Sequence, residues 1–315
     1  MKAGSPRWCE RPAMHSDPAD LLESLLAGLW QTLPGSIRAY ADACWPRGTH
    51  RGLPWPESQV MVIPSQRLMY VPIAKNGCST FKRLMVRLAG YPDGTAVSAR
   101  IHEYLDFYET GLQLKDWPHA DVGRFMSDPG WFRFTVLRDP LERLVSAYLE
   151  KFVRNRMEPG NRVHTSVVVS AVQGSDKPDF RAGITFREFT QYIASTPPEC
   201  LDPHWRPQAL CLPSRCEGLR YFSLYDITPL SAQLVDWCGF TGAIGHDNSA
   251  FGKQLGAPAP AGADTPPDEL ETYEAVSPQS LVEESMQDRL AAYLEQDQSG
   301  IGASPARLHG EMTVS

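Results

Sequence analysis

A lysine and a run of small residues stand in the segment AKNGCSTFKRL (74–84), which follows a short apolar stretch. Lys75 can neutralise an oxyanion, and Gly77 lets the backbone approach a ligand closely because it has no side chain. Ser79 and Thr80 add hydroxyl donors, and the unpaired, partly positive N–H groups at the start of a helix bind anions well. The segment therefore predicts an anion-binding loop. A plain turn, with Lys75 in solvent and Ser79 capping the helix, is the competing interpretation.

An arginine and a serine follow the alternating segment WFRFTVL (131–137) at a spacing that also suits an anion. Arg138 ends this segment and can bind a phosphate through two parallel hydrogen bonds. Ser146 lies about 12 Å further along a helix axis, so a phosphate that touches both side chains must lie beside the helix, with Arg138 leaning along it. The competing interpretation is an Arg–Glu pair at the surface and a serine that faces solvent.

Each of these loops is expected between a buried strand and an amphipathic helix. The apolar runs VMVIP (60–64) and LMYVPI (68–73) suit buried strands, and 131–137 alternates as a strand does. A helix is predicted over 78–90. A second helix is predicted from Asp139 onward, because Asp is a favoured N-cap residue. Two strand–loop–helix units predict an α/β fold of three layers, with a central parallel sheet flanked by helices.

The segments outside these two units differ from them in amino-acid composition and in predicted structure. Residues 1–58 predict a helical and Pro-rich extension to an α/β core at 59–250. Residues 251–315 predict a linker rich in Pro, Ala and acidic residues, followed by a C-terminal helix at about 279–296. Within the core, the polar segment 153–180 is expected to be a surface loop.

The composition limits the kinds of partner. A net charge of −7 at pH 7 argues against a nucleic-acid partner, which needs a basic surface. No run approaches the roughly 20 apolar residues of a membrane span, so we expect a soluble, cytoplasmic protein. Seven scattered cysteines do not suit a disulfide framework, although Cys200, Cys211 and Cys216 leave open a local bridge or metal site. No metal is expected, because no typical ligand spacing occurs, and no pattern defines an oligomeric state.

The two loops together carry a family resemblance. VPIAKNGCSTFKRL and FTVLRDPLERLVSAYLEKF resemble the two cofactor motifs of the carbohydrate sulfotransferases, in the branch that includes the chondroitin, dermatan and HNK-1 sulfotransferases. HWRPQALCLP matches a further segment, so the resemblance covers about residues 65–240. Ala74 replaces a common proline and Thr228-Pro229 a common Gly-Lys, which leaves the acceptor undefined. The family's membrane anchor is absent, so we expect a soluble bacterial member with a P-loop-like fold.

The resemblance implies a reaction and a cofactor. The donor would be 3′-phosphoadenosine 5′-phosphosulfate (PAPS), and its sulfuryl group would pass by in-line displacement to a hydroxyl of a glycan or glycosylated small molecule. The first loop would bind the 5′-phosphosulfate, with Lys75 neutralising the leaving oxygen. Arg138 and Ser146 would bind the 3′-phosphate, and no metal would be required. The implied cofactor-binding residues of the first loop are Lys75, Asn76, Gly77, Cys78, Ser79, Thr80 and Phe81.

Removal of the acceptor's proton calls for a base with a pKa near neutrality, a task that suits histidine. The candidates are His102, in SARIHEYLDF, and His204, in DPHWRP, with Glu103 as an alternative. The competing interpretations are a surface position for His102 and a structural hydrogen bond for His204. Trp205 could line the acceptor site or belong to the core.

Two other functions compete with sulfotransfer. A P-loop kinase of similar architecture would need the pattern GxxxxGK[ST], which the chain lacks. A non-catalytic nucleotide-binding relative would keep the fold without the chemistry, and the presence of both Lys75 and Arg138 argues against it.

Overall fold

The computed structural model describes residues 53–91, 101–107, 109–244, 261–272 and 276–301. The chain divides into two compact units, Met1–Arg51 and Gly52–Ser315, and every described residue belongs to the second. Most of the predicted extension 1–58 therefore lies outside the described residues. The predicted boundary at residue 250 also falls outside them and stays a prediction.

Four strands form one sheet in the order β1-β2-β3-β4. They are β1 (Met61–Ile63), β2 (Leu68–Val71), β3 (Phe132–Leu137) and β4 (Leu219–Ser223). β2, β3 and β4 run parallel, whereas β1 is antiparallel to β2, because only an antiparallel pair can be joined by so short a turn. The first three strands match predicted ones. β4 is not among the predicted strands, since this partly exposed edge strand has no apolar run.

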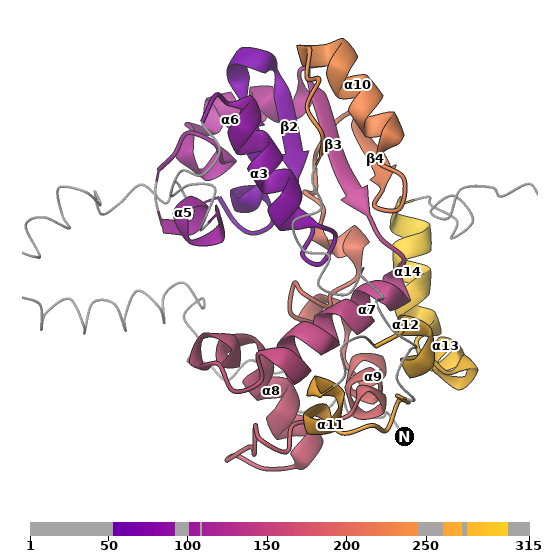
Figure 1. Cartoon of the computed structure of the whole chain (residues 1–315). Helices are drawn as coiled ribbons and strands as arrows, with labels where there is room; N and C mark the ends of the chain where they lie inside the picture. Colours follow the sequence, from indigo (N-terminus) through magenta and orange to yellow (C-terminus); the bar gives the residue numbers. More distant parts are fainter. Residues whose placement is uncertain (1–52, 92–100, 108, 245–260, 273–275, 302–315) are drawn as a thin grey trace, which may run out of the picture. The chain divides into compact units, whose positions relative to one another are not determined.

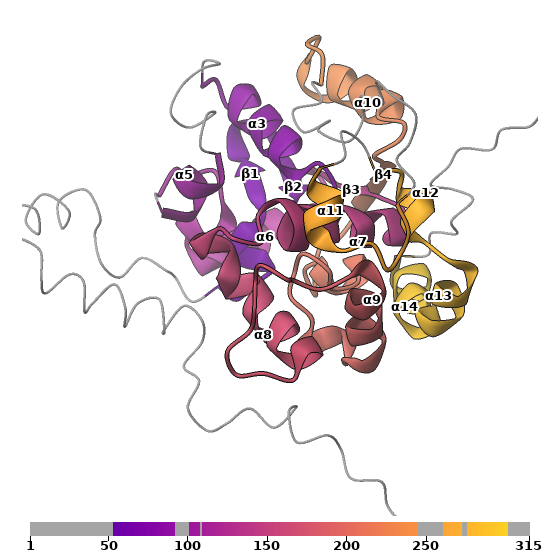
Figure 2. The ribbon, with the colours of Figure 1, turned by 60° about the horizontal axis from the view of Figure 1, so that its bottom comes forward.

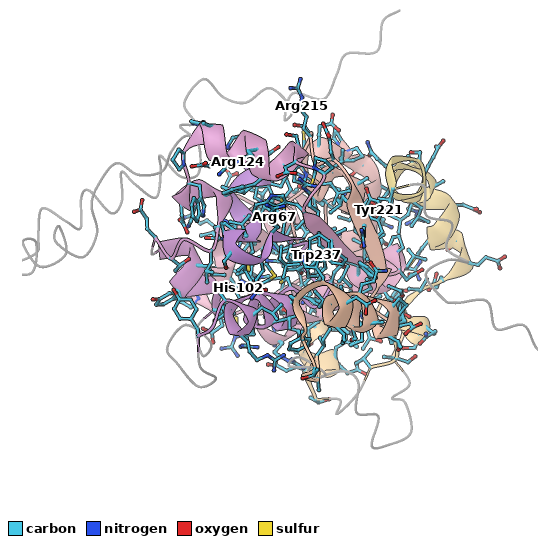
Figure 3. The ribbon with its side chains drawn as sticks, turned by 90° about the horizontal axis from the view of Figure 1, so that it is seen from above. Arg67, His102, Arg124, Arg215, Tyr221 and Trp237 are labelled. Atoms are coloured by element: carbon cyan, nitrogen blue, oxygen red, sulfur yellow. The ribbon has the colours of Figure 1, made fainter. Side chains whose placement is uncertain are left out.

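Helices cover both faces of the sheet. On one face lie α3 (Cys78–Leu88), α5 (Ile101–Phe107) and α10 (Thr228–Cys238). On the other lie η3 (Leu114–Asp116) and α6 (His119–Ser127). Figure 3 shows α6, marked by Arg124, and α10, marked by Trp237, on opposite sides of the sheet. The predicted α/β fold with a central parallel sheet flanked by helices is confirmed, with the edge strand β1 as its one antiparallel member.

Helix α7 (Pro140–Tyr148) begins where β3 ends, at the same edge of the sheet as the start of α3 (Figure 1). Asp139 is its N-cap, and its carboxylate accepts hydrogen bonds from the N–H groups of Leu141 and Glu142, both at 3.0 Å. The predicted helix start is confirmed. After Tyr148 the helix continues as a π-helix, η4 (Leu149–Arg154), a wide turn that is often found at functional sites.

A second hydrophobic core forms around α7 and η4, with Tyr148, Phe152 and Trp205 among its largest side chains. It is completed by α8 (Arg162–Gln173), α9 (Phe186–Ser195), α11 (Pro267–Glu271), α12 (Pro278–Leu281), α13 (Glu284–Arg289) and α14 (Ala291–Ile301). Figure 2 shows these helices gathered around α7. Short 3₁₀ helices form several bends: η1 (Glu57–Gln59), η2 (Pro64–Gln66), η5 (Pro159–Asn161), η6 (Pro198–Cys200) and η7 (Gln208–Cys211).

Two sequence predictions about helices are wrong. The segment 153–180 is not a surface loop, because it contains α8, whose Val168 and Val169 are buried in the second core. The single helix expected at about 279–296 is three helices, since the backbone is extended at Val282 and bends again between α13 and α14. These bends bring four apolar side chains into the second core together: Leu281, Met286, Leu290 and Tyr293.

None of the described helices combines the length with the apolar character that spanning a lipid bilayer requires. Cys200, Cys211 and Cys216 form no disulfide bond among the described residues, so the local bridge considered from the sequence is not present.

The buried guanidinium of Arg133 offers a test of the fold. It donates hydrogen bonds to the carbonyls of Phe125, Asp128 and Glu217, at 2.6 to 3.0 Å. Arg133→Met removes these buried hydrogen bonds, so the free energy of unfolding should fall by about 2 kcal/mol or more in denaturant titrations. Arg124→Met, at an exposed position on α6, should change it by less than about 1 kcal/mol. Equal losses in the two variants would contradict the assigned role.

Candidate functional site

Both predicted loops open into one cavity of about 770 Å³. It lies at the carboxyl ends of β2 and β3, which meet at one edge of the sheet because the strands are parallel. Most of the residues predicted to bind the cofactor, and both candidate histidines, line it. Those lining residues are Lys75, Gly77, Cys78, Ser79, Thr80, Phe81, His102, Arg138, Ser146 and His204.

The first loop turns sharply before α3. Gly77 is the N-cap of α3 with a φ of 71°, in the left-handed region that favours glycine. A Cβ at this position would lie 3.1 Å from Leu224 Cδ1. The N-cap residue Gly77 has no side chain with which to cap α3, and N–H groups at a helix start bind anions well. The plain-turn interpretation had Ser79 as the helix cap, and this part of it is wrong because Gly77 is the N-cap.

Lys75 forms a salt bridge with Glu150 of η4 instead of extending into solvent. Burial lowers the pKa of Lys75, and the Glu150 carboxylate opposes that shift. Burial likewise favours the neutral form of Glu150, but the charge and hydrogen bond of Lys75 outweigh it and hold the pKa of Glu150 below its ordinary value. The two groups are therefore a charged pair inside the cavity.

Arg138 leans along α7, as its spacing from Ser146 requires for a shared phosphate. Its Nη2 lies 3.7 Å from Glu142 Oε2, one turn into the helix, and its Nη1 donates to the carbonyl of Lys75 at 3.3 Å. Its Nε is buried and has no hydrogen-bond partner within the described part of the chain. The Arg–Glu pair of the competing interpretation is thus present, although Arg138 itself lines the cavity together with Ser146.

Arg143 supports the site, a role that is not among the sequence predictions. Its fully buried guanidinium donates to the carbonyls of Ala74, Arg206 and Pro203, at 2.9, 2.6 and 2.9 Å. It ties the first loop and the segment around His204 to α7. A sequence signal was available, because Arg143 occupies a position on the buried stripe of this helix.

Asn76 is the predicted cofactor residue that does not line the cavity. Its side chain is fully buried, and its Nδ2 donates to the Val136 carbonyl at 2.8 Å and to Gln208 Oε1 at 2.6 Å. Gln208 also bonds the backbone of Arg138 and the Asp297 carboxylate of α14. The C-terminal helix thereby reaches the site through residues that are far away in the sequence.

His102 lies over the first turn of α3. Its Nε2 is 2.8 Å from Ser79 Oγ, and its Nδ1 is 3.4 Å from the Nζ of Lys82. It is exposed near the start of α5, and it also lines the cavity; Figure 3 marks its position. The side chain of Glu103, the alternative base, lies outside the described residues.

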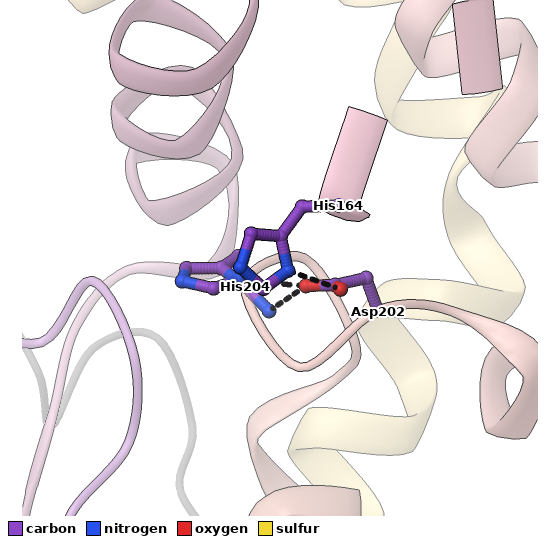
Figure 4. A group of neighbouring side chains, drawn as sticks. All are labelled: His164, Asp202 and His204. Atoms are coloured by element: carbon purple, nitrogen blue, oxygen red, sulfur yellow. Dashed lines mark hydrogen bonds and ion pairs between the residues drawn. The ribbon is translucent and has the colours of Figure 1, made fainter. Parts of the chain in front are cut away.

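His204 belongs to a cluster that Figure 4 shows. Asp202 bonds the Nδ1 of His204 at 2.7 Å and the Nδ1 of His164 at 2.9 Å. Burial lowers the pKa of His204 to about 4, although the Asp202 carboxylate opposes the shift. The ligand atoms of the three residues lie within 4.8 Å of one another, a donor set that could hold a divalent cation. No sequence pattern singles out His164 or Asp202, and α8 brings His164 to the cluster from a distant part of the chain.

Trp205 belongs to the second core and is only 1% exposed, so the core interpretation holds for it. Cys78, at the start of α3, is a free thiol in the cavity wall. Burial raises its pKa, but the hydrogen bond to His102 and the charges of Lys82 and Lys75 outweigh burial and lower the pKa to about 7.

The sequence model of the sulfotransferase family matches residues 58–242, which is more than half of the chain. The chain belongs to the sulfotransferase family. Human carbohydrate sulfotransferase 14 is 31% identical over 155 residues, which cover 49% of this chain and 39% of that protein. Carbohydrate sulfotransferase 10 of Xenopus laevis is 28% identical over 148 residues (46% and 40%), and carbohydrate sulfotransferase 8 of mouse is 27% identical over 205 residues (61% and 47%).

The alignments to these curated relatives thus span less than half of each relative's length. No solved structure matches the chain. The resemblance to the carbohydrate sulfotransferases that the two loops carry is confirmed by these relatives.

The shifted pKa of His204 predicts a specific loss of stability in acid. A histidine that folding holds neutral binds fewer protons in the folded than in the unfolded state, so stability falls as the pH drops from about 6.5 to about 4. His204→Gln should remove up to about 3 kcal/mol of this loss, measured as the free energy of unfolding against pH. His119→Gln, at an exposed position on α6, should leave the profile unchanged. A profile equally steep in His204→Gln would contradict the assignment.

Proposed function

We propose that this chain is a PAPS-dependent sulfotransferase that transfers a sulfuryl group to a hydroxyl of a carbohydrate acceptor. One observation carries the proposal: Lys75 and the start of α3 face the same cavity as Arg138 and Ser146. A nucleotide with an anionic group at each end of its ribose could engage both sets. The names of the relatives support a carbohydrate as the acceptor.

The side chains fit such a donor. Arg138 lines the cavity, and its buried Nε has no hydrogen-bond partner among the described residues, although buried polar groups in proteins are generally hydrogen-bonded. The N–H groups at the start of α3 provide a second anion site, and Gly77 lets a ligand approach the backbone. A cavity of about 770 Å³ lies within the range of about 300–1,000 Å³ that is typical of ligand sites.

In an in-line displacement, the residues at the two ends of the donor have different roles. The donor supplies an activated sulfuryl group on a phosphate leaving group. Lys75 and the start of α3 stabilise the charge that develops on the leaving oxygen. Arg138 and Ser146 hold the opposite end of the nucleotide and so fix its orientation. The reaction therefore depends mainly on positioning and charge stabilisation.

His102 is the base in this proposal. Its contact with Ser79 places it at the loop that holds the reacting group, whereas His204 is committed to Asp202. To accept a proton, one nitrogen of His102 must exchange Ser79 or Lys82 for the acceptor hydroxyl. His204 is the alternative base, because its Nδ1 faces Asp202 and its ring lines the same cavity.

Calorimetric binding tests the donor assignment. Adenosine 3′,5′-bisphosphate should bind more tightly than ATP, because Arg138 and Ser146 have a 3′-phosphate to engage. Arg138→Ala should weaken binding of the bisphosphate about 10- to 100-fold, the range expected for a charge-assisted hydrogen bond. Arg124→Ala, outside the cavity, is the matched control. A preference for ATP would overturn the assignment in favour of a kinase-like function.

Transfer of labelled sulfate from PAPS to a panel of carbohydrates tests the reaction. His102→Gln should lower the rate about 100- to 10,000-fold, as loss of a general base does, while bisphosphate affinity stays nearly unchanged. If His204→Gln shows that loss instead, His204 is the base. Tight bisphosphate binding without transfer to any acceptor would support a non-catalytic relative.

A further inference from the structure

Glu150 is the only carboxylate among the described residues that line the cavity. The same lining holds five basic side chains, namely Lys75, Lys82, Arg138, Lys151 and Arg154. A negative charge in a pocket that is proposed to bind a highly anionic donor weakens that binding by repulsion. The position of Glu150 therefore needs an explanation other than direct contact with the donor.

The contacts of Glu150 identify Lys75 as its partner. Glu150 Oε2 accepts from the Nζ of Lys75, and Oε1 lies 3.7 Å from the Nζ of Lys151. The Lys75 side chain is 12% exposed and that of Glu150 is 37% exposed. The ion pair is thus partly shielded from water, where charges interact more strongly than at an open surface.

The helix that carries Glu150 also carries Ser146. The helix changes from α to π at Leu149, immediately before Glu150. Both Ser146 and Glu150 line the cavity. The helix proposed to bind the 3′-phosphate therefore also holds the lysine proposed to act at the other end of the donor.

The backbone of Lys75 is constrained as well. Its φ of 71° is in the left-handed region, which is uncommon for a residue with a side chain. Arg138 donates to its carbonyl at 3.3 Å. Lys75 is therefore held at its backbone by the turn and by Arg138, and at its Nζ by Glu150.

The charges around Lys75 act in opposite directions. Burial lowers its pKa and Lys151 of η4 adds to that effect, whereas Glu150 of η4 and Cys78 of α3 raise it. Arg138, which follows β3, contacts its carbonyl. His204 acts on Glu150 from the segment that follows η6. Of these groups, Glu150 is the one hydrogen-bonded to Lys75 Nζ.

We propose that Glu150 is a positioning residue for Lys75. In the ligand-free protein its carboxylate takes the place of the donor's anionic group, which keeps Lys75 protonated and directed into the cavity. When an anion binds at the start of α3, Lys75 exchanges the carboxylate for that anion. This inference rests on the proposed function, because it takes Lys75 to be the lysine that meets the phosphosulfate.

A titration without ligand tests the link between the two residues. Lysines carrying isotope-labelled methyl groups are followed by NMR against pH, and Lys75 is identified by the signal that is lost in Lys75→Arg. Glu150→Gln should lower the pKa of Lys75 by about one unit or more, and Glu150→Asp should restore part of the shift. Glu271→Gln is the matched control, because it removes a carboxylate paired with Arg156 at 2.5 Å outside the cavity lining. An unchanged titration of Lys75 in Glu150→Gln overturns the inference.

Binding of adenosine 3′,5′-bisphosphate tests the exchange. In Glu150→Gln its affinity near neutral pH should rise several-fold, because the competing carboxylate is gone. At alkaline pH, binding should take up more protons than in the wild type, measured by calorimetry in buffers of different ionisation enthalpy. Weaker binding with unchanged proton uptake would indicate a merely structural role and overturn the inference.

The two measurements separate this inference from the proposed function. If the wild type does not bind the bisphosphate, the proposed function fails, and the ligand-free titration still decides whether Glu150 controls Lys75. If the wild type binds the bisphosphate but Lys75 titrates identically in Glu150→Gln, only the role of Glu150 is wrong.

Discussion

The buried guanidinium of Arg143 is the interaction on which the site depends. It joins three pieces of backbone that are distant in the sequence: the first loop at Ala74, the segment at Pro203 and Arg206, and its own helix. A buried charge is stable only where its donors are hydrogen-bonded, so the three carbonyls must remain in place around it. The lysine loop, the helix with Arg138 and Ser146, and the segment with His204 therefore face one cavity.

A second set of buried polar groups fixes the ends of the two central strands. Gln208 bonds the backbone of Arg138, the side chain of Asn76 and the carboxylate of Asp297. Burial raises the pKa of Asp297, which makes its hydrogen bonds to this segment important for keeping it in the interior. In this way α14 supports the loops, although it contributes no residue to the described lining of the cavity.

Electrostatics separates the two candidate bases more clearly than sequence does. Both are histidines next to apolar residues, so the sequence alone does not distinguish them. In the structure His102 touches Ser79 of the anion loop and the ammonium group of Lys82. His204 instead shares Asp202 with His164 and is buried enough to be neutral near pH 7. Part of the difference arises from residues such as Ser79 and His164, which the fold brings in from other parts of the chain.

The sequence by itself determined the local units of this protein. Three of the four strands, the start of α7 at Asp139 and the lysine and arginine loops all follow from periodicity, capping and residue type, because these depend on neighbouring residues. The edge strand β4 and helix α8 were missed, since one lacks an apolar run and the other gains its stability from packing.

Only the tertiary structure decided how the loops work together. The parallel pairing of β2 with β3 brought the two loops to one edge, and Arg143 then fixed their spacing. The partner of Lys75 could not be predicted, because a salt bridge between residues so far apart in the chain depends on folded distance and burial and leaves no periodic signal. The sequence therefore identified the lysine, and the fold placed Glu150 beside it.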